Sequence, residues 1–470
     1  MNLVGFLEAE SGLGEVARRL AAIIDASGIQ LAAIPYRGTL GRQNHSLELA
    51  LTSDAPFDVN LISLSADDLT KFAAEVGGGF FANRYSIGVW FWETNVFSSA
   101  ERTATRFLDE LWVASDYVRE SVVDEVDVPV HVVPVPMEVP RGPFRSRSEL
   151  GLPQRFTFLF VFDFWSGVRK NPSAVVEAFS RAFRPDEGPA LLLKSINGRD
   201  WKPRQLEGLR ALAGGRQDIL IRDGYVSAEE RDSLLACCDC YISLHRSEGL
   251  GLTMAEAMAC GKPVIATGYS GNLQFMSDEN SYLVPFHLVD VPQTWWAYAP
   301  GARWAAPDID AAASLMRHVW EHADDARERG RRARDDLLTR FAPERTAAFV
   351  EQRLDELRTT GAVASRSGGH DARPAIVDAS RALDGKGMGE ALARGPRFRP
   401  ASFARRLLRK ALWPHLDEQR RFETTVVDAL TELQRTVDAQ ERRIARLEEG
   451  LDRTPGGQGS SGGEARPDRP

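Results

Sequence analysis

The stretch "YISLHRSEGLGLTMAEAMACGKPVIATGYSGNLQF", residues 241–275, is the most informative part of the sequence. Its apolar start predicts a buried strand, which is followed by a polar loop with two glycines. A helix is expected to begin near Leu252, and Gly261 is suited to end it. Pro263 then opens a further apolar run, "VIAT". A strand, a glycine loop, a helix and a second strand in this order indicate a parallel α/β sheet.

Two carboxylates flank the glycine loop of this stretch. Glu248 precedes the loop and Glu256 lies one turn into the helix, so they are expected very roughly 10 Å apart along one wall. Between them the first turn of the helix offers N–H groups and a partial positive charge, which favour a diphosphate. A sugar nucleotide carries hydroxyl groups at both ends and a diphosphate in the middle, and it therefore fits this arrangement.

Apolar runs alternate with helical patterns over most of the chain and predict two successive α/β domains. Residues 1–150 are expected to form the first, Rossmann-like domain. Residues 151–341 form the second, Rossmann-like domain, which is expected to bind the nucleotide sugar. A helix over residues 342–358 is expected to pack back on the first domain.

The remaining residues change in character and predict an extension. Residues 359–400 are rich in Gly, Ala, Arg and Ser and indicate a linker. Residues 401–413 form a basic amphipathic helix, which is expected to rest on an anionic membrane surface or to dock on protein. A heptad pattern over 416–451 predicts a coiled coil that joins a second copy or a partner helix. A lone amphipathic helix is the alternative, and 452–470 are expected to be a disordered tail.

Residues 241–275 resemble family 4 of the retaining glycosyltransferases, which have the GT-B fold. The resemblance rests on the E-x7-E pair, Glu248 and Glu256, and is supported by "SGLGEVAR" (11–18) and "RKNP" (169–172). It covers roughly residues 1–358. It implies two Rossmann-like domains that face each other across a cleft, with the acceptor on the side of the first domain. It also implies transfer of a sugar from a nucleotide diphosphate sugar to an acceptor hydroxyl with retention, as in polysaccharide or cell-envelope glycan assembly.

The resemblance also implies roles for individual residues. Glu248 would contact the hydroxyls of the donor sugar, and Glu256 would bind the nucleotide ribose. The diphosphate would meet the backbone of the second domain on one side and the glycine turn of the first domain on the other. The residues expected there are Leu250, Gly251, Leu252, Gly12, Leu13 and Gly14. His245 in the polar loop and Asn272 in "YSGN" are further candidates for the donor pocket.

Cations are expected to neutralise the leaving diphosphate. The family usually has an Arg and a Lys five residues apart, and Lys170 matches the Lys. The position five residues earlier is Trp165, so the arginine role is open between Arg169 and Lys194. The aromatic stretch "WFWE", residues 90–93, follows a strand end and is either an acceptor site or a set of core aromatics with a helix-capping Glu.

Several other kinds of site are disfavoured by the sequence. Gly12, Gly14 and Ala17 fit a dinucleotide fingerprint, but the next strand ends without the carboxylate that an NAD ribose needs. Clustered cysteines (Cys237, Cys238, Cys240 and Cys260) fit buried thiols in a reducing compartment better than a zinc site. The D-x-D of residues 308–310 fits a helix N-cap. We therefore expect neither a catalytic metal nor a cofactor beyond the donor substrate.

Composition limits the class of protein further. The sequence is 43% hydrophobic and 26% charged, with a formal net charge of −8, which disfavours nucleic acid as a partner. Its start has no secretory pattern and no apolar run spans a bilayer, so a cytoplasmic protein is expected, with possible peripheral contact at the inner membrane face. Two alternatives stay open: a GT-B sugar-nucleotide epimerase, and a non-catalytic sugar-binding scaffold assembled by the coiled coil.

Overall fold

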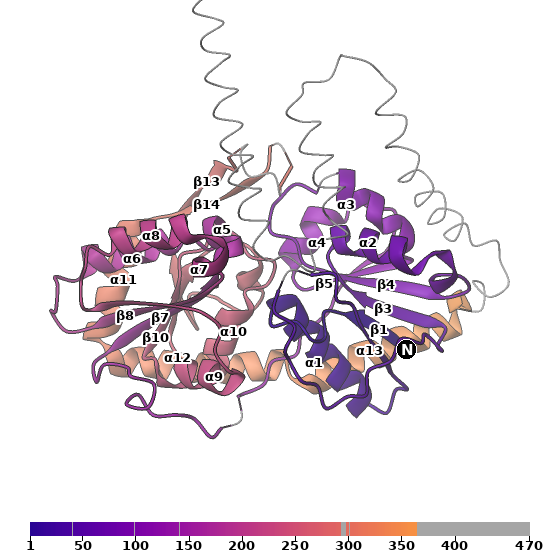
Figure 1. Cartoon of the computed structure of the whole chain (residues 1–470), viewed down its shortest axis with the longest axis horizontal. Coiled ribbons are helices and arrows are strands. Elements are labelled where there is room, and N and C mark those ends of the chain that lie inside the picture. Colours follow the sequence, from indigo (N-terminus) through magenta and orange to yellow (C-terminus); the bar gives the residue numbers. More distant parts are fainter. Residues whose placement is uncertain (40, 98, 141, 293–297, 300, 364–470) are drawn as a thin grey trace, which may run out of the picture. The chain divides into compact units, whose positions relative to one another are not determined.

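A computed structural model describes residues 1–363 except 40, 98, 141, 293–297 and 300 (Figure 1). The predicted basic helix (401–413), coiled coil (416–451) and tail (452–470) lie outside the described residues, as does the predicted linker from residue 364 onward. Every structural statement below concerns the described part of the chain.

The first domain is built on a six-stranded parallel sheet with the strand order β2-β1-β3-β4-β5-β6. Because both faces of the sheet are covered, its strands are almost continuously apolar, as in "YSIGVW" of β4. The strands are β1 (Asn2–Gly5), β2 (Ala32–Pro35), β3 (Val59–Ser63), β4 (Tyr85–Trp90), β5 (Glu110–Val113) and β6 (Val130–Val132).

Helices cover the two faces of this sheet, and successive strand residues alternate between them. Leu3 packs on the face that carries α1, whereas Val4 packs on the face that carries α2 and α4. Serines at the N-caps begin these helices by accepting a backbone N–H. The helices are α1 (Gly12–Ala26), α2 (Ala66–Val76), α3 (Ser99–Ala104) and α4 (Asp116–Val122).

The second domain has another six-stranded parallel sheet, with the order β12-β11-β10-β7-β8-β9. Its strands are β7 (Thr157–Asp163), β8 (Ala190–Ile196), β9 (Ile219–Asp223), β10 (Cys240–Ser243), β11 (Val264–Thr267) and β12 (Tyr282–Val284). Its helices are α5 (Gly167–Lys170), α6 (Pro172–Ala182), α7 (Gly198–Trp201), α8 (Pro203–Leu212), α9 (Ala228–Cys237), α10 (Leu252–Ala259), α11 (Ile309–Glu321) and α12 (Ala323–Arg340).

An antiparallel hairpin between β12 and α11 is a feature that the sequence analysis missed. It consists of β13 (Phe286–Asp290) and β14 (Arg303–Pro307). The side chain of Trp304 is buried in a small apolar cluster with Val291 and Ala302, and Val96 of the first domain packs against that cluster. The hairpin therefore contacts both domains, and the apolar run that precedes it gave no sign of a second strand pair.

The strand order fixes where ligands gather in each sheet. In the second sheet the order reverses between β7 and β10, and in the first between β1 and β3. Ligands of open α/β sheets bind outside the carboxyl ends of the strands at this point. In the second domain, α5 follows β7 and the loop to α10 follows β10. The residues with predicted chemistry in these two segments therefore meet.

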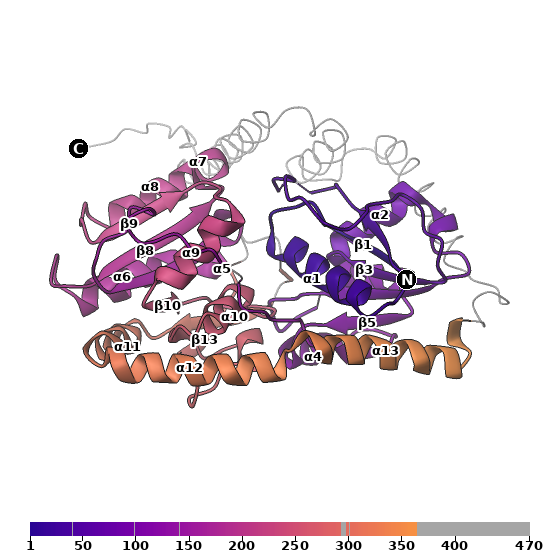
Figure 2. The same ribbon diagram turned by 90° about the horizontal axis from the view of Figure 1, so that it is seen from below.

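Helix α13 (Pro343–Thr359) returns to the first domain, where it lies alongside α1 (Figures 1 and 2). Its Thr346 Oγ1 donates to Pro134 O at 2.6 Å. The guanidinium of Arg353 pairs at 2.7 Å with Glu110, whose side chain is fully buried in β5. The chain thus crosses from the second domain back to the first. No helix among the described residues is both long and apolar enough to cross a bilayer.

Two glycines provide a matched test of the packing of α12. A Cβ at Gly330 would lie 2.4 Å from Gly261 O, whereas a Cβ at Gly208 on α8 would meet no atom within 4 Å. We expect Gly330→Ala to destabilise the protein by about 1–3 kcal/mol through overpacking. Gly208→Ala is expected to stabilise it by up to about 1 kcal/mol through helix propensity. Urea denaturation measures both, and a Gly330→Ala variant as stable as wild type would contradict the close approach of α12.

Candidate functional site

The loop between β10 and α10 presents the backbone that the sequence analysis assigned to a diphosphate. Gly251, the N-cap of α10, has a φ of +91°, which glycine adopts without strain. No side chain caps this helix, so its first N–H groups remain available to an anion together with the helix dipole. Leu250 is buried, whereas Leu252 at the start of the helix is partly exposed.

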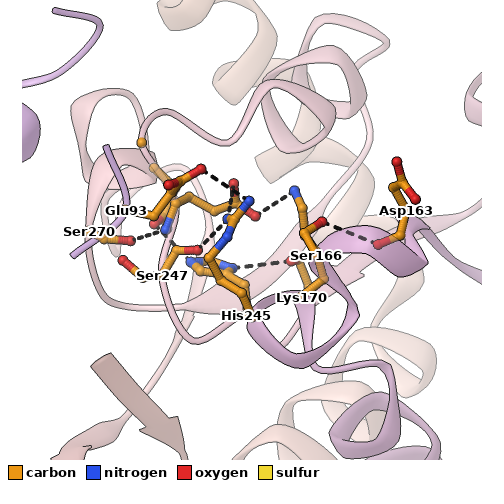
Figure 3. Close-up of polar contacts among 12 residues, drawn as sticks. Glu93, Asp163, Ser166, Lys170, His245, Ser247 and Ser270 are labelled. Atoms are coloured by element: carbon orange, nitrogen blue, oxygen red, sulfur yellow. Dashed lines mark hydrogen bonds and ion pairs between the residues drawn. The ribbon is translucent and has the colours of Figure 1, made fainter. Parts of the chain in front are cut away.

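Glu248 lies in this loop with its carboxylate held by two cations, one of which is the Lys170 labelled in Figure 3. Lys170 Nζ lies 2.6 Å from Oε1, and Arg169 Nη1 lies 3.0 Å from Oε2. Burial by itself would raise the pKa of Glu248, but the charges of Lys170 and Arg169 outweigh it and lower that pKa to about 2. Glu248 is therefore ionised throughout the physiological pH range.

Arg169 connects Glu248 to the first domain. Its guanidinium lies 3.3 Å from Glu93 Oε1 and donates to Ser247 O at 2.7 Å. Burial disfavours the charged guanidinium, yet Glu248 and Glu93 together raise the pKa of Arg169. Tyr298 from the hairpin donates to Glu93 Oε2 at 3.4 Å. The cluster thus contains groups from the first domain, α5, the Glu248 loop and the hairpin, and Glu93 is an ion-pair partner here rather than a helix cap.

The position of the usual family arginine is occupied by an exposed aromatic side chain. Trp165 is 37% exposed, and Lys202 Nζ lies 4.6 Å from its ring centroid. Lys194, the other candidate for the arginine role, donates from Nζ to Ser195 O at 2.8 Å and to Gly224 O. Burial lowers the pKa of Lys194 to about 8. The structure therefore brings Arg169 to Glu248 but does not bring Lys194 there.

Glu256 points toward the first domain. Arg19 on α1 lies 2.6 Å from its Oε1, and the same guanidinium pairs with Glu15 at 2.9 Å. Burial disfavours the charge of Arg19, but Glu256 and Glu15 raise its pKa. Arg231 on α9 is a further cation near both carboxylates. Sequence reasoning missed Arg19 and Arg231, because only the fold brings α1 and α9 to α10.

The two glycines of the turn in the first domain, Gly12 and Gly14, have different surroundings. Gly14 donates its N–H to Ser11 Oγ at 3.2 Å, and a Cβ there would lie 2.4 Å from Ala9 O. Gly14 is therefore required by packing. A Cβ at Gly12 would meet no atom within 4 Å, and Leu13 beside it is partly exposed. Gly12 and Leu13 thus form the open part of the turn.

His245 and Asn272 use their polar atoms inside the protein. His245 is fully buried, its Nδ1 lies 3.1 Å from Ser243 Oγ, and its Nε2 lies 3.1 Å from Asn272 Oδ1. Burial lowers the pKa of His245, so the ring is neutral at pH 7. Asn272 Nδ2 donates to Thr267 O at 3.0 Å. Both side chains are fully buried and use their polar atoms in hydrogen bonds within the protein. Neither therefore presents a polar atom for the predicted contact with a donor.

Hydrogen bonds across the two domains surround this loop. Ser115 Oγ at the N-cap of α4 donates to Gly249 O at 2.7 Å, and the hydroxyl of Tyr117 lies 3.2 Å from that of Tyr269. Asp116 N donates to Gln274 Oε1 at 2.9 Å. Nothing in the local sequence of these residues identified them as contacts between the domains.

Metal-binding patterns in the sequence have structural explanations. Asp308 is the N-cap of α11 and accepts from Ala311 N at 2.9 Å, which confirms the capping prediction for the D-x-D. The four cysteines are free thiols, and burial raises the pKa of Cys238 to about 12. Among the described residues no three His, Cys, Asp or Glu side chains form a group that would hold a metal ion.

Replacing Glu248 by Gln tests the ion-pair cluster. The substitution leaves the buried Arg169 and the partly exposed Lys170 without their shared carboxylate, so we expect a loss of about 3–5 kcal/mol in the free energy of unfolding near pH 7. The pKa of Glu248 is about 2 in the fold and 4.5 ordinarily. Its contribution is therefore complete above about pH 4.5 and is lost as the pH falls toward 2.

Urea denaturation of wild type and Glu248→Gln at a series of pH values measures this difference. It should be constant from about pH 8 to 5 and should shrink below about 4.5. Glu279→Gln, at an exposed glutamate, is the matched control and should change neither stability nor its pH dependence. A Glu248→Gln variant of wild-type stability at pH 7 would contradict the cluster.

The sequence of the second domain is similar to that of known glycosyltransferases. Residues 155–291 match the sequence model of the family described as Glycosyl transferases group 1. The D-inositol 3-phosphate glycosyltransferase of Xylanimonas cellulosilytica is 30% identical over 205 residues, which are 42% of this chain and 47% of that protein. The chain thus spans about half the length of this curated relative.

Solved structures share the fold over a larger part of the chain. Sucrose-phosphate synthase from Thermosynechococcus elongatus has a TM-score of 0.57 at 16% identity, covering 76% of this chain and 99% of that one. The Anabaena protein HepE in complex with UDP-glucose has a TM-score of 0.57 at 14% identity, with the same two coverages. The chain therefore has the GT-B fold of two Rossmann-like domains, and its residues 155–291 carry the sequence pattern of the group 1 glycosyltransferases.

Proposed function

We propose that this protein is a retaining glycosyltransferase that moves a sugar from a nucleotide diphosphate sugar to an acceptor hydroxyl. One observation carries the proposal: an uncapped helix N-terminus at the switch point of the second sheet, with Glu248 before it and Glu256 one turn inside it. The structural neighbour HepE, which has UDP-glucose bound, and the family pattern of residues 155–291 support it.

The donor diphosphate is proposed to lie at the N-terminus of α10. The backbone N–H groups of Leu250, Gly251 and Leu252 would bind its oxygens, with Gly12 and Leu13 on the opposite side. The ionised Glu248 would accept hydrogen bonds from the sugar hydroxyls. Lys170 lies 2.6 Å from Glu248 and is partly exposed, so it can contact both that carboxylate and the leaving phosphate.

The nucleotide ribose is proposed to bind Glu256. In the structure this carboxylate is paired with Arg19, whose second partner is Glu15 on the same helix. The ribose hydroxyls can replace Arg19 at Glu256 because Glu15 continues to neutralise the guanidinium. Donor binding would in this way exchange one charge-assisted contact for another without leaving a buried charge unpaired.

In the proposed reaction the bond between the anomeric carbon and the phosphate oxygen breaks, and a bond to the acceptor oxygen forms on the same face of the sugar. The acceptor proton passes to the leaving phosphate. Lys170 and the α10 N-terminus stabilise the negative charge that develops on the diphosphate, and Arg169 holds Glu248 in place. With these cations in position, we propose that transfer needs no resident metal ion or cofactor.

The biological setting is proposed on the family resemblance. The product would be a polysaccharide or another cell-envelope glycan, made in the cytoplasm or at the inner face of the membrane. Residues 416–451 would assemble copies of the chain or a partner helix.

Lys170→Ala tests the proposed site. Without this ammonium group the developing charge on the diphosphate loses one stabilising contact, so transfer should fall on the order of 10²–10³-fold. The assay measures sugar transfer and donor hydrolysis across a panel of UDP- and GDP-sugars. Lys71→Ala on α2, a surface lysine paired with Asp68, is the control and should keep wild-type turnover. Full turnover in Lys170→Ala would disprove the assignment.

Two further measurements test the reaction itself. The anomeric configuration of the product, read by NMR, should match that of the donor. Transfer should keep its rate in excess EDTA, because the positive charge at the diphosphate comes from the protein. An inverted product or loss of activity in EDTA would contradict the respective part of the proposal. Conversion of the donor without an acceptor into an isomeric sugar nucleotide would indicate the epimerase instead.

A further inference from the structure

Arg246, in the loop before Glu248, is a cation without a counter-ion. Among the described residues its guanidinium has no carboxylate and no hydrogen-bond partner, and its Nε is buried without an acceptor. Within the described part of the chain, the guanidinium lies against the ring of Trp304, whose centroid is 5.6 Å from Cζ. An arginine stays charged in proteins, so this half-buried charge lacks an anion.

The backbone of Arg246 is fixed on both sides. Its N–H donates to Arg169 O at 2.8 Å, and its carbonyl accepts from Ala305 N of β14 at 2.8 Å. The ring beneath the guanidinium belongs to Trp304, which is 1% exposed. The backbone of Arg246 is thus held between the end of α5 and the hairpin, two residues from Glu248.

The carboxylates in this region are engaged by other cations. Glu248 pairs with Lys170 and Arg169, and Glu93 pairs with Arg169. The hairpin connection "PQTWWAYAPG", residues 292–301, contains no Asp or Glu. Burial lowers the pKa of Arg246, and no charged group offsets it. The charge therefore destabilises the free protein and would be stabilised by an anionic ligand.

We propose that Arg246 binds an anionic group, a phosphate or a carboxylate, on the acceptor. The planar guanidinium suits two oxygens of such a group. Two partly exposed aromatic side chains, Trp92 and Tyr298, have ring centroids 5.9 Å apart. Tyr298 in turn packs on the buried Trp304, with centroids 6.2 Å apart. Partly exposed rings such as those of Trp92 and Tyr298 can stack on sugar or polyol faces. The inference rests on the proposed function and narrows its acceptor to an acidic polyhydroxy compound.

Binding of inorganic phosphate tests the site without requiring the natural acceptor. We expect phosphate to raise the melting temperature of the wild-type protein in the presence of saturating UDP, and to leave that of Arg246→Met unchanged. Arg303→Met is the matched control, because Arg303 lies on the same hairpin but pairs with Asp290 at 3.6 Å. It should keep the response to phosphate.

Two results of this titration would overturn the assignment. One is an equal response of Arg246→Met and wild type. The other is a wild-type response that disappears when UDP is added, because phosphate would then occupy the donor diphosphate position. A wild-type protein that does not respond to phosphate at all would also contradict it.

Kinetics provide the second readout. With a phosphorylated polyol as acceptor, Arg246→Met should raise KM on the order of tenfold to a hundredfold with little change in kcat, and Arg246→Lys should recover part of the loss. With the unphosphorylated polyol, KM should be unchanged. Equal effects on both acceptors would contradict the inference. Absence of transfer by the wild-type protein would contradict the proposed function, whereas the phosphate titration would still decide the role of Arg246.

Discussion

The buried ion pairs of Arg169 are the interaction on which the rest of the site depends. This guanidinium lies between Glu248 of the second domain and Glu93 of the first. Arg169 and Glu248 are buried and Glu93 is partly exposed, so the charge of Arg169 is stable here only because the two carboxylates offset its desolvation. The attraction of Arg169 to both therefore fixes the Glu248 loop, the end of α5 and the segment after β4 relative to one another.

A second group of ion pairs repeats this principle at the other carboxylate. Arg19 on α1 pairs with both Glu256 and Glu15. Glu256 is therefore paired directly with the first domain, whereas Glu248 is connected to it through Arg169. The two carboxylates differ in what a ligand has to displace. In the proposed donor complex, Glu248 would keep Arg169 when Lys170 contacts a phosphate, whereas Glu256 would release Arg19 to Glu15. Donor binding would then be coupled through charge to the contact between the two domains.

The cations of the site are of two kinds. Those of the first kind are already paired with carboxylates, so a ligand anion would have to replace a carboxylate to bind them; they are Arg169, Lys170 and Arg19. Arg246 has an aromatic ring in place of a carboxylate. Under the proposals above, the paired cations would hold the site in shape before substrate binds, and the unpaired Arg246 would contribute to the affinity for an anionic acceptor. Trp165 stands where the resemblance to family 4 predicts an arginine, and Arg169, four residues further along the chain, lies beside Glu248.

By itself the sequence determined the two parallel α/β sheets, the start of α10 at Leu252 and the uncapped glycine N-terminus, because apolar periodicity and glycine act locally. It also singled out Glu248, Glu256 and Lys170. Only the tertiary structure paired Arg169 with Glu93, brought Arg19 to Glu256, kept Lys194 away from Glu248 and folded residues 286–307 into a hairpin. These outcomes depend on strand order and on contacts between distant segments, and local residue patterns carry no record of either.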